Sequence, residues 1–106
     1  MANALVLLLL AALSPAAAAQ QAGERCTAVD GASLRCGREL VRVDGLRAPA
    51  LNDAGGHEAR QRLQARLRHG EVVIQRYGYD KRGYTLGRLY VSGKRISQVD
   101  VTPRRK

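Results

Sequence analysis

Apolar residues form one long run at the start of the chain and only short, interrupted runs after it. Residues 4–13 are all apolar, a run too short to span a bilayer, which takes about 20 residues in a helix. The alanines at 17–19 then form the A-x-A pattern of a signal-peptidase cleavage site. We therefore expect residues 1–19 to be a signal peptide and the protein to be exported, either periplasmic or secreted. A retained membrane anchor is the alternative, because no Lys or Arg precedes the run.

The rest of the chain has the pattern of short strands separated by turns, with one helix. Short spans rich in apolar residues are each bounded by Gly, Asp or Ser. Residues 57–69 differ, because Ala59, Leu63 and Leu67 recur every four residues, as on one side of a helix, and Gly70 follows. The predicted strands are 25–29, 33–36, 39–43, 71–77 and 84–91, and a turn at 92–93 leads into residues 94–96.

The first two predicted strands form a hairpin that places the two cysteines opposite each other. The turn is centred on Gly31, and Cys26 and Cys36 lie at equal distances on either side of it. Directly opposed residues in an antiparallel pair bring their Cβ atoms within bridging range. An exported protein also meets an oxidising compartment. The sequence therefore predicts a Cys26–Cys36 disulfide rather than a metal site, since two cysteines alone do not complete a tetrahedral zinc site.

The order of three strands, a helix and two strands predicts the fold class. We expect a mainly β protein with five short antiparallel strands and one α-helix after the third strand. A small closed β-barrel of the OB type has this order, and that fold often holds oligonucleotides across one face. The domain is expected to span residues 20–101, and residues 102–106 form a basic C-terminal tail.

The charge of the chain favours anionic partners. The 106 residues include 18 Lys and Arg against 9 Asp and Glu, a net charge of +9, and all of these residues follow position 19. Nucleic acid, acidic polysaccharide and an anionic membrane surface all suit such a charge, whereas the alternative is a role in solubility alone. Arg62 and Arg66 lie four residues apart on the predicted helix. They mark either a phosphate-facing surface or, as is more common, a solvated helix face.

Three segments of the chain resemble the staphylococcal nuclease (thermonuclease) family. They are V-D-G-A-S-L at 29–34, V-R-V-D-G-L-R-A-P-A at 41–50 and D-K-R-G-Y-T-L at 80–86, and the similarity covers about residues 24–99. Family members carry D-G-D-T, R-L-x-G-I-D-A-P-E and D-x-Y-G-R-x-L in these places. The resemblance implies an SNase-like OB-type barrel and, in active members, Ca²⁺-dependent hydrolysis of phosphodiesters in DNA and RNA.

Most of the residues that carry out the family's reaction are replaced in this chain. The two metal-binding aspartates correspond to Ala32 and Arg47, the glutamate that serves the attacking water to Ala50, and the second arginine to Tyr84. Only Arg42 is retained. Loss of a general base alone costs about 10² to 10⁴ in rate, and an arginine in place of a metal ligand repels the cation. We therefore expect no catalytic residues, no bound metal and no Ca²⁺ cofactor, so enzymatic activity is uncertain.

The altered cleft is expected to be positively charged and to bind nucleic acid or another polyanion directly. Arg42 has a second interpretation, as a structural brace to Asp30 or Asp44. The tyrosines at 77, 79, 84 and 90 would offer stacking surfaces for bases, although in a chain without Phe or Trp we expect at most two of them to be exposed. The expected binding residues are Arg42, Arg47, Lys81, Arg82 and Tyr84.

Two other functions remain open from the sequence. Residues 96–101 run into Thr102-Pro103 without the terminal helix usual in relatives, so an exposed apolar surface there would suit a protein partner or self-association in the cell envelope. The less favoured alternative is a residual phosphodiester-cleaving activity with His57 or His69 as base.

Overall fold

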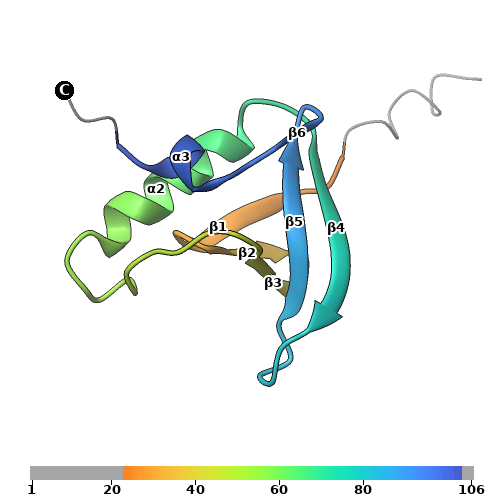
Figure 1. Cartoon of the computed structure of the whole chain (residues 1–106), viewed down its shortest axis with the longest axis horizontal. Coiled ribbons are helices and arrows are strands. Elements are labelled where there is room, and N and C mark those ends of the chain that lie inside the picture. The colour runs from red at the N-terminus through yellow and green to blue at the C-terminus, as the bar shows by residue number, and fades with distance from the viewer. Residues whose placement is uncertain (1–22, 104–106) are drawn as a thin grey trace, which may run out of the picture.

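Six strands and two helices make up the part of the chain that the computed structural model describes, residues 23–103 (Figure 1). The expected signal peptide lies outside the described residues, as do residues 104–106 of the expected tail. No helix within the described part is long and apolar enough to cross a membrane. In chain order the elements are β1 (Cys26–Asp30), β2 (Ser33–Cys36), β3 (Glu39–Val43), α2 (Gly56–Leu67), β4 (Val72–Tyr79), β5 (Thr85–Val91), β6 (Lys94–Arg95) and α3 (Gln98–Val101).

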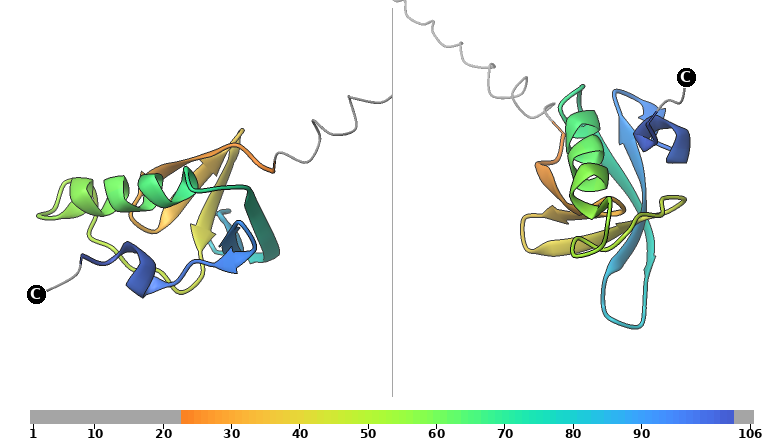
Figure 2. Two further views of the ribbon diagram at one scale, coloured as in Figure 1. Left: turned by 90° about the horizontal axis from the view of Figure 1, so that it is seen from above. Right: turned by 90° about the vertical axis from the view of Figure 1, so that its left-hand side faces the viewer.

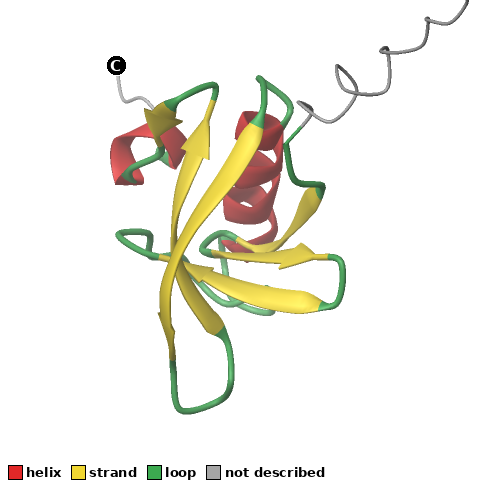
Figure 3. Cartoon of the chain, turned by 90° about the vertical axis from the view of Figure 1, so that its right-hand side faces the viewer, coloured by secondary structure: helices red, strands yellow, loops and turns green. Residues whose placement is uncertain are grey.

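The strands form one mixed sheet (Figure 3). Its order is β1-β2-β3-β5-β4, with β6 paired to β5. All pairs are antiparallel except β3 and β5, which run parallel with Val41 opposite Thr85. The expectation of five antiparallel strands is therefore wrong at this pair. A parallel pair needs a crossover of a dozen or more residues, and here α2 and β4 lie between the two strands in the chain.

The sheet does not close into a barrel, which corrects the expected closed architecture. β1 and β4 are the two ends of the strand order, and no strand pairing within residues 23–103 joins them. One backbone hydrogen bond bridges them, from the Glu24 N–H to the Val72 carbonyl at 2.9 Å. At the edge of β1, the Gln64 side chain of α2 accepts the Ala28 N–H at 2.8 Å. The helix therefore packs beside β1 (Figure 2). Its Gln64 side chain binds a backbone N–H that would pair with another strand in a closed barrel.

The predicted hairpin and its disulfide are confirmed. Cys26 lies opposite Cys36 in the register of β1 and β2, and a disulfide joins them. The turn between the strands lies close to the helix. A Cβ atom on Gly31 would lie 2.5 Å from the Ala48 Cβ and 2.6 Å from the Ala59 Cβ. Gly31 therefore lets the hairpin turn, the loop after β3 and the start of α2 meet without a steric clash.

The core lies between the sheet and α2. Along β5, buried residues alternate with half-buried ones, as expected for a strand that packs one face inward. On α2, Ala59, Leu63 and Leu67 are buried, as the sequence predicted, although the helix ends two residues before the predicted boundary. The fully buried apolar side chains include Leu34, Val41, Leu63 and Leu89, which come from β2, β3, α2 and β5.

A one-turn helix follows the sheet, so the predicted lack of a C-terminal helix is wrong in part. In α3, the Ser97 side chain and Asp100 form a capping box, and the Ser97 N–H donates to the Asp100 carboxylate at 2.8 Å. That hydrogen bond lowers the pKa of Asp100. Val101 is buried, whereas Val99 is 79% exposed. The helix thus covers the end of the core with a single apolar side chain.

Two arginines of α2 hold α3 in place. The Arg62 Nε donates to the Val101 carbonyl at 2.6 Å, and the Arg66 Nε donates to the Asp100 carbonyl at 2.8 Å. These carbonyls lie at the end of a helix, where they have no partner within the helix. Arg62 and Arg66 are half-buried, so they are structural contacts rather than the phosphate-facing or purely solvated pair considered from the sequence.

Candidate functional site

A basic cleft of about 350 Å³ lies where four segments meet: the β1–β2 turn, β3, the loop after β3 and the β4–β5 loop. Its lining includes three arginines and one carboxylate. The lining residues are Asp30, Ala32, Arg42, Leu46, Arg47, Ala48, Ala50 and Arg82.

Each of the three arginines forms a hydrogen bond, through its side chain in Arg42 and through its backbone N–H in Arg47 and Arg82. Arg42 on β3 faces Ser33 on β2 in the strand register, and its Nη1 donates to the Ser33 hydroxyl at 3.1 Å. The Arg47 N–H donates to the Gln98 side chain of α3 at 2.8 Å, which attaches the loop after β3 to the C-terminal helix. The Arg82 N–H donates to the Asp80 carboxylate at 2.8 Å, an Asx turn that orders the tip of the β4–β5 loop.

The cleft arginines carry unbalanced positive charge. The ion pairs among residues 23–103 involve Arg76, Lys94 and Arg95, and none involves Arg42, Arg47 or Arg82. The one carboxylate of the cleft, Asp30, accepts the Ala32 N–H at 2.8 Å. Three guanidinium groups and one carboxylate leave a net charge of about +2 in a small concave site, and such a site attracts anions.

The role of Arg42 as a brace to an acidic residue is not seen in the described structure. Its side chain donates a hydrogen bond to the Ser33 hydroxyl. Asp44 is instead bound by Arg95 at 2.6 Å and by the Tyr77 hydroxyl at 2.9 Å, and the hydrogen bond to Asp44 raises the pKa of Tyr77. Arg42 is exposed, so its guanidinium remains accessible to a ligand.

The structure brings together most, but not all, of the residues singled out from the sequence. Arg42, Arg47 and Arg82 line the cleft together with Ala32 and Ala50, whereas Lys81 and Tyr84 are not among its lining residues. The Tyr84 N–H donates to Asp80 at 2.9 Å, and the residue is half-buried. These placements leave the roles assigned to the individual residues as predictions.

The donor set of the cleft does not suit Ca²⁺, which needs six to eight oxygen ligands, several of them carboxylates. Asp30 is the only acidic residue in the lining, and the surrounding arginines repel a cation. Among residues 23–103, one group of three donors lies close together, formed by Glu24, Cys26 and Cys36. The two sulfur atoms of that group are bonded to each other, so they are not thiolate ligands.

The tyrosines do not line the cleft either. Tyr77 is 48% exposed and Tyr79 is 76% exposed, while Tyr84 and Tyr90 are half-buried, in agreement with the expected limit of two exposed rings. Arg88 packs over the Tyr77 ring, 4.7 Å from its centre. Neither His57 nor His69 lines the cleft.

An ion-pair network that the sequence did not predict links β4 to β3 and to the segment before β1. Arg76 on β4 pairs with Glu24, before β1, and with Glu39 on β3, each at 2.7 Å. Glu39 also accepts the Thr85 hydroxyl at 2.7 Å. The hydrogen bond from Arg76, followed by that from Thr85, lowers the pKa of Glu39 to about 2, and the same pairing raises the pKa of Arg76.

This network predicts a loss of stability in acid. The pKa of Glu39 lies below its ordinary value of 4.5, so its contribution is complete above about pH 4.5 and disappears as the pH falls towards 2. Because the pair is partly exposed to solvent, we expect a contribution of at most ~1 kcal/mol. Urea unfolding of Glu39→Gln should therefore show a smaller loss between neutral and acidic pH than the parent protein, whereas the exposed control Glu58→Gln should not. Equal pH dependence of Glu39→Gln and the parent would contradict the assignment.

Comparison with known proteins does not assign a function to this chain, so the geometry of the cleft is the basis for one. The chain matches no protein-family model, and no curated protein matches it significantly.

Proposed function

We propose that this protein is an exported domain related to the staphylococcal nuclease family that binds nucleic acid or another polyanion without cleaving it. The observation that carries the proposal is the basic cleft, where Arg42, Arg47 and Arg82 converge without an acidic partner in the described residues. Each planar guanidinium matches the geometry of a phosphate oxygen pair. A phosphodiester backbone is the ligand class that best satisfies three such groups at once.

The strand order supports an OB-type relationship even though the sheet is open. An OB-fold is a five-stranded, partly open Greek-key barrel, and the order β1-β2-β3-β5-β4 with the helix after β3 is compatible with it. The three segments of family resemblance also meet at one place, since Ala32, Arg42, Arg47, Ala50 and Arg82 all line the cleft. Export would bring the +9 domain into contact with extracellular polyanions, and the disulfide is compatible with that location.

Binding rather than hydrolysis follows from what the cleft residues are able to do. Arginines neutralise phosphate charge and position the backbone. They do not activate a water molecule, because a guanidinium stays protonated. Ala32 and Ala50 offer no side-chain oxygen, and the one carboxylate of the cleft, Asp30, accepts a backbone N–H with its Oδ1. The protein is thus expected to hold a phosphodiester and release it unchanged.

The test is fluorescence anisotropy of a labelled single-stranded oligonucleotide, titrated with the oxidised domain at two salt concentrations, first with Ca²⁺ and then with chelator. Three phosphate contacts predict a log–log salt slope of about −2, which weakens binding roughly 15-fold between about 50 and 200 mM salt. Arg42→Ala and Arg47→Ala should each reduce that slope by about 0.7. Arg38→Ala, in the exposed β2–β3 turn, is the matched control and should leave the slope within error of the parent.

Each alternative has its own outcome in the same experiment. A Ca²⁺-dependent fall of the anisotropy to that of short fragments would indicate an active nuclease and overturn the proposal. Absence of binding at low salt would favour the protein-interaction module. That alternative receives little support from α3, where Val99 is the exposed apolar residue of the helix.

A further inference from the structure

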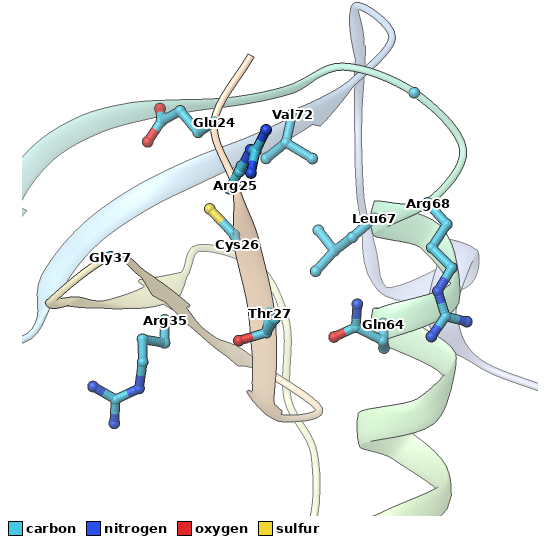
Figure 4. Close-up of a pocket in the computed structure, with 11 residues that line it drawn as sticks. Glu24, Arg25, Cys26, Thr27, Arg35, Gly37, Gln64, Leu67, Arg68 and Val72 are labelled. Atoms are coloured by element: carbon cyan, nitrogen blue, oxygen red, sulfur yellow. The ribbon is translucent and has the colours of Figure 1, made fainter. Parts of the chain in front are cut away.

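A second hollow lies beside β1, on the side where the strand meets the end of α2 (Figure 4). Its volume is about 430 Å³, larger than that of the cleft. Arg25 precedes β1, Arg35 lies on β2 and Arg68 follows α2, so three separate segments supply a positive charge to its lining. All three arginines are exposed, and none of them forms an ion pair with another residue in the range 23–103.

The single carboxylate of this hollow does not neutralise the arginines. Glu24 lines it, but its carboxylate is bound to Arg76 at 2.7 Å and accepts the Ile74 N–H at 3.2 Å. Arg76, which Glu24 shares with Glu39, therefore offsets part of the charge of Glu24. The hollow keeps a net positive charge, which favours an anionic occupant.

Gln64 adds a hydrogen-bond donor of fixed orientation. Figure 4 shows its side chain projecting from α2 towards β1. Its Oε1 accepts the Ala28 N–H at 2.8 Å, so the Nε2 amino group is the end of the amide that remains for a ligand. An oriented amide donor beside guanidinium groups is a suitable arrangement for phosphate oxygens.

The hollow continues along the helix instead of ending at one anion-sized site. A neighbouring hollow of about 340 Å³ is lined by Arg60, Gln61, Gln64 and Arg68, and it shares Gln64 and Arg68 with the first. We call the two together the α2 groove. An isolated phosphate would occupy only part of it, so its shape and charge suit a linear polyanion.

The α2 groove and the basic cleft lie at the two ends of β1. Cys26 and Thr27 line the groove, whereas Asp30 lines the cleft. At about 3.3 Å per residue, these positions are separated by about 10 to 13 Å. The helix follows the same path, because its Ala59 lies against Gly31 at the hairpin turn and its Gln64 contacts Ala28.

We propose that the α2 groove is a second binding site for the phosphodiester backbone of single-stranded nucleic acid, used together with the cleft by the same strand. The inference rests on the proposed function of the cleft. Separations of this size are within reach of a few nucleotides, and single-strand sites on OB-type domains cover about 4 to 16 nucleotides. Neither Arg25 nor Arg68 lines the cleft, so the two sites are separable by mutation.

The test compares two oligothymidylates, of about 4 and about 16 nucleotides, in anisotropy titrations with the oxidised protein. The Arg25→Ala/Arg68→Ala variant should bind the long strand roughly 10-fold more weakly and reduce its log–log salt slope by about 1.4, while the short strand changes less than about twofold. Arg88→Ala, which removes one charge over the Tyr77 ring, is the control for an arginine outside both sites and should affect neither strand. Thermal unfolding checks that each variant keeps the parent fold.

The outcomes separate this inference from the function of the cleft. If Arg42→Ala/Arg47→Ala weakens both strands but the groove variant weakens neither, the groove is not a binding site and the cleft proposal stands. If the cleft variant leaves both strands unchanged, the proposed function of the cleft fails, and the shared-strand model fails with it. Equal weakening of the long strand by Arg88→Ala would show a general charge effect and overturn the inference.

Discussion

Reduction of the Cys26–Cys36 disulfide should lower the stability of the domain by about 2.5 to 3 kcal/mol. The two cysteines are 10 residues apart in the chain, and closing a loop of this size removes that much conformational freedom from the unfolded state. For a domain of about 80 residues, the expected fall in the midpoint of thermal unfolding is roughly 10 to 20 °C. Both cysteines also pack against the core, so reduction removes a covalent link between two strands beside the α2 groove.

The measurement is thermal unfolding followed by circular dichroism, with and without reductant, and the free thiols are counted by alkylation. The control is the Cys26→Ser/Cys36→Ser variant, which should unfold near the midpoint of the reduced parent and should not respond to reductant. An unchanged unfolding midpoint in fully reduced protein would show that the disulfide does not stabilise the domain by restricting the unfolded chain.

Introducing the acidic residues of the nuclease motifs that this chain resembles should create a Ca²⁺ site in the cleft. The Ala32→Asp/Arg47→Asp/Ala50→Glu variant would place three new carboxylates beside Asp30, because all four positions line one cleft. Ala32 is only 5% exposed, so the new aspartate there would be costly without a cation to balance it. We therefore expect the variant to be less stable than the parent in chelator and to be stabilised by Ca²⁺.

The expected size of the effect follows from linkage. At a Ca²⁺ concentration about 100 times the dissociation constant, binding contributes about 2.7 kcal/mol, which raises the unfolding midpoint by roughly 10 °C or more. The control is Ala32→Asn/Arg47→Asn/Ala50→Gln, which has side chains of similar shape without charge and should show no Ca²⁺ shift. An absent shift in the acidic variant would argue against the correspondence with the family motifs.

The parts of the fold that the sequence predicted correctly depend on contacts close in the chain. The cysteines face each other as in a hairpin centred on Gly31, although a bulge between Ala28 and Asp30 shifts the pairing next to the turn. The buried side of α2 follows from the helical spacing of Ala59, Leu63 and Leu67. In both cases a local repeat determines which residues share a face.

The sequence predicted that the candidate site is rich in arginine, but it predicted only some of the lining residues correctly. The resemblance to the nuclease motifs identified Arg42, Arg47 and Arg82, and all three line the cleft. It also suggested Lys81 and Tyr84, which do not line the cleft. The α2 groove has no sequence motif, since Arg25, Arg35 and Arg68 come from segments that meet only in the folded chain.

The short β-strands, the long helix, the disulfide and the excess of positive charge were all predictable from the sequence, because each depends on neighbouring residues or on composition alone. The neighbour of each strand was not, since β3 pairs with β5 in parallel, and β1 and β4 do not pair with each other. The tertiary structure also decided which charges are balanced. Arg76 meets Glu24 and Glu39 across 52 and 37 residues, while the arginines of the cleft and the α2 groove form no ion pair within residues 23–103. Partners so distant in the chain are selected by packing, which no local pattern encodes.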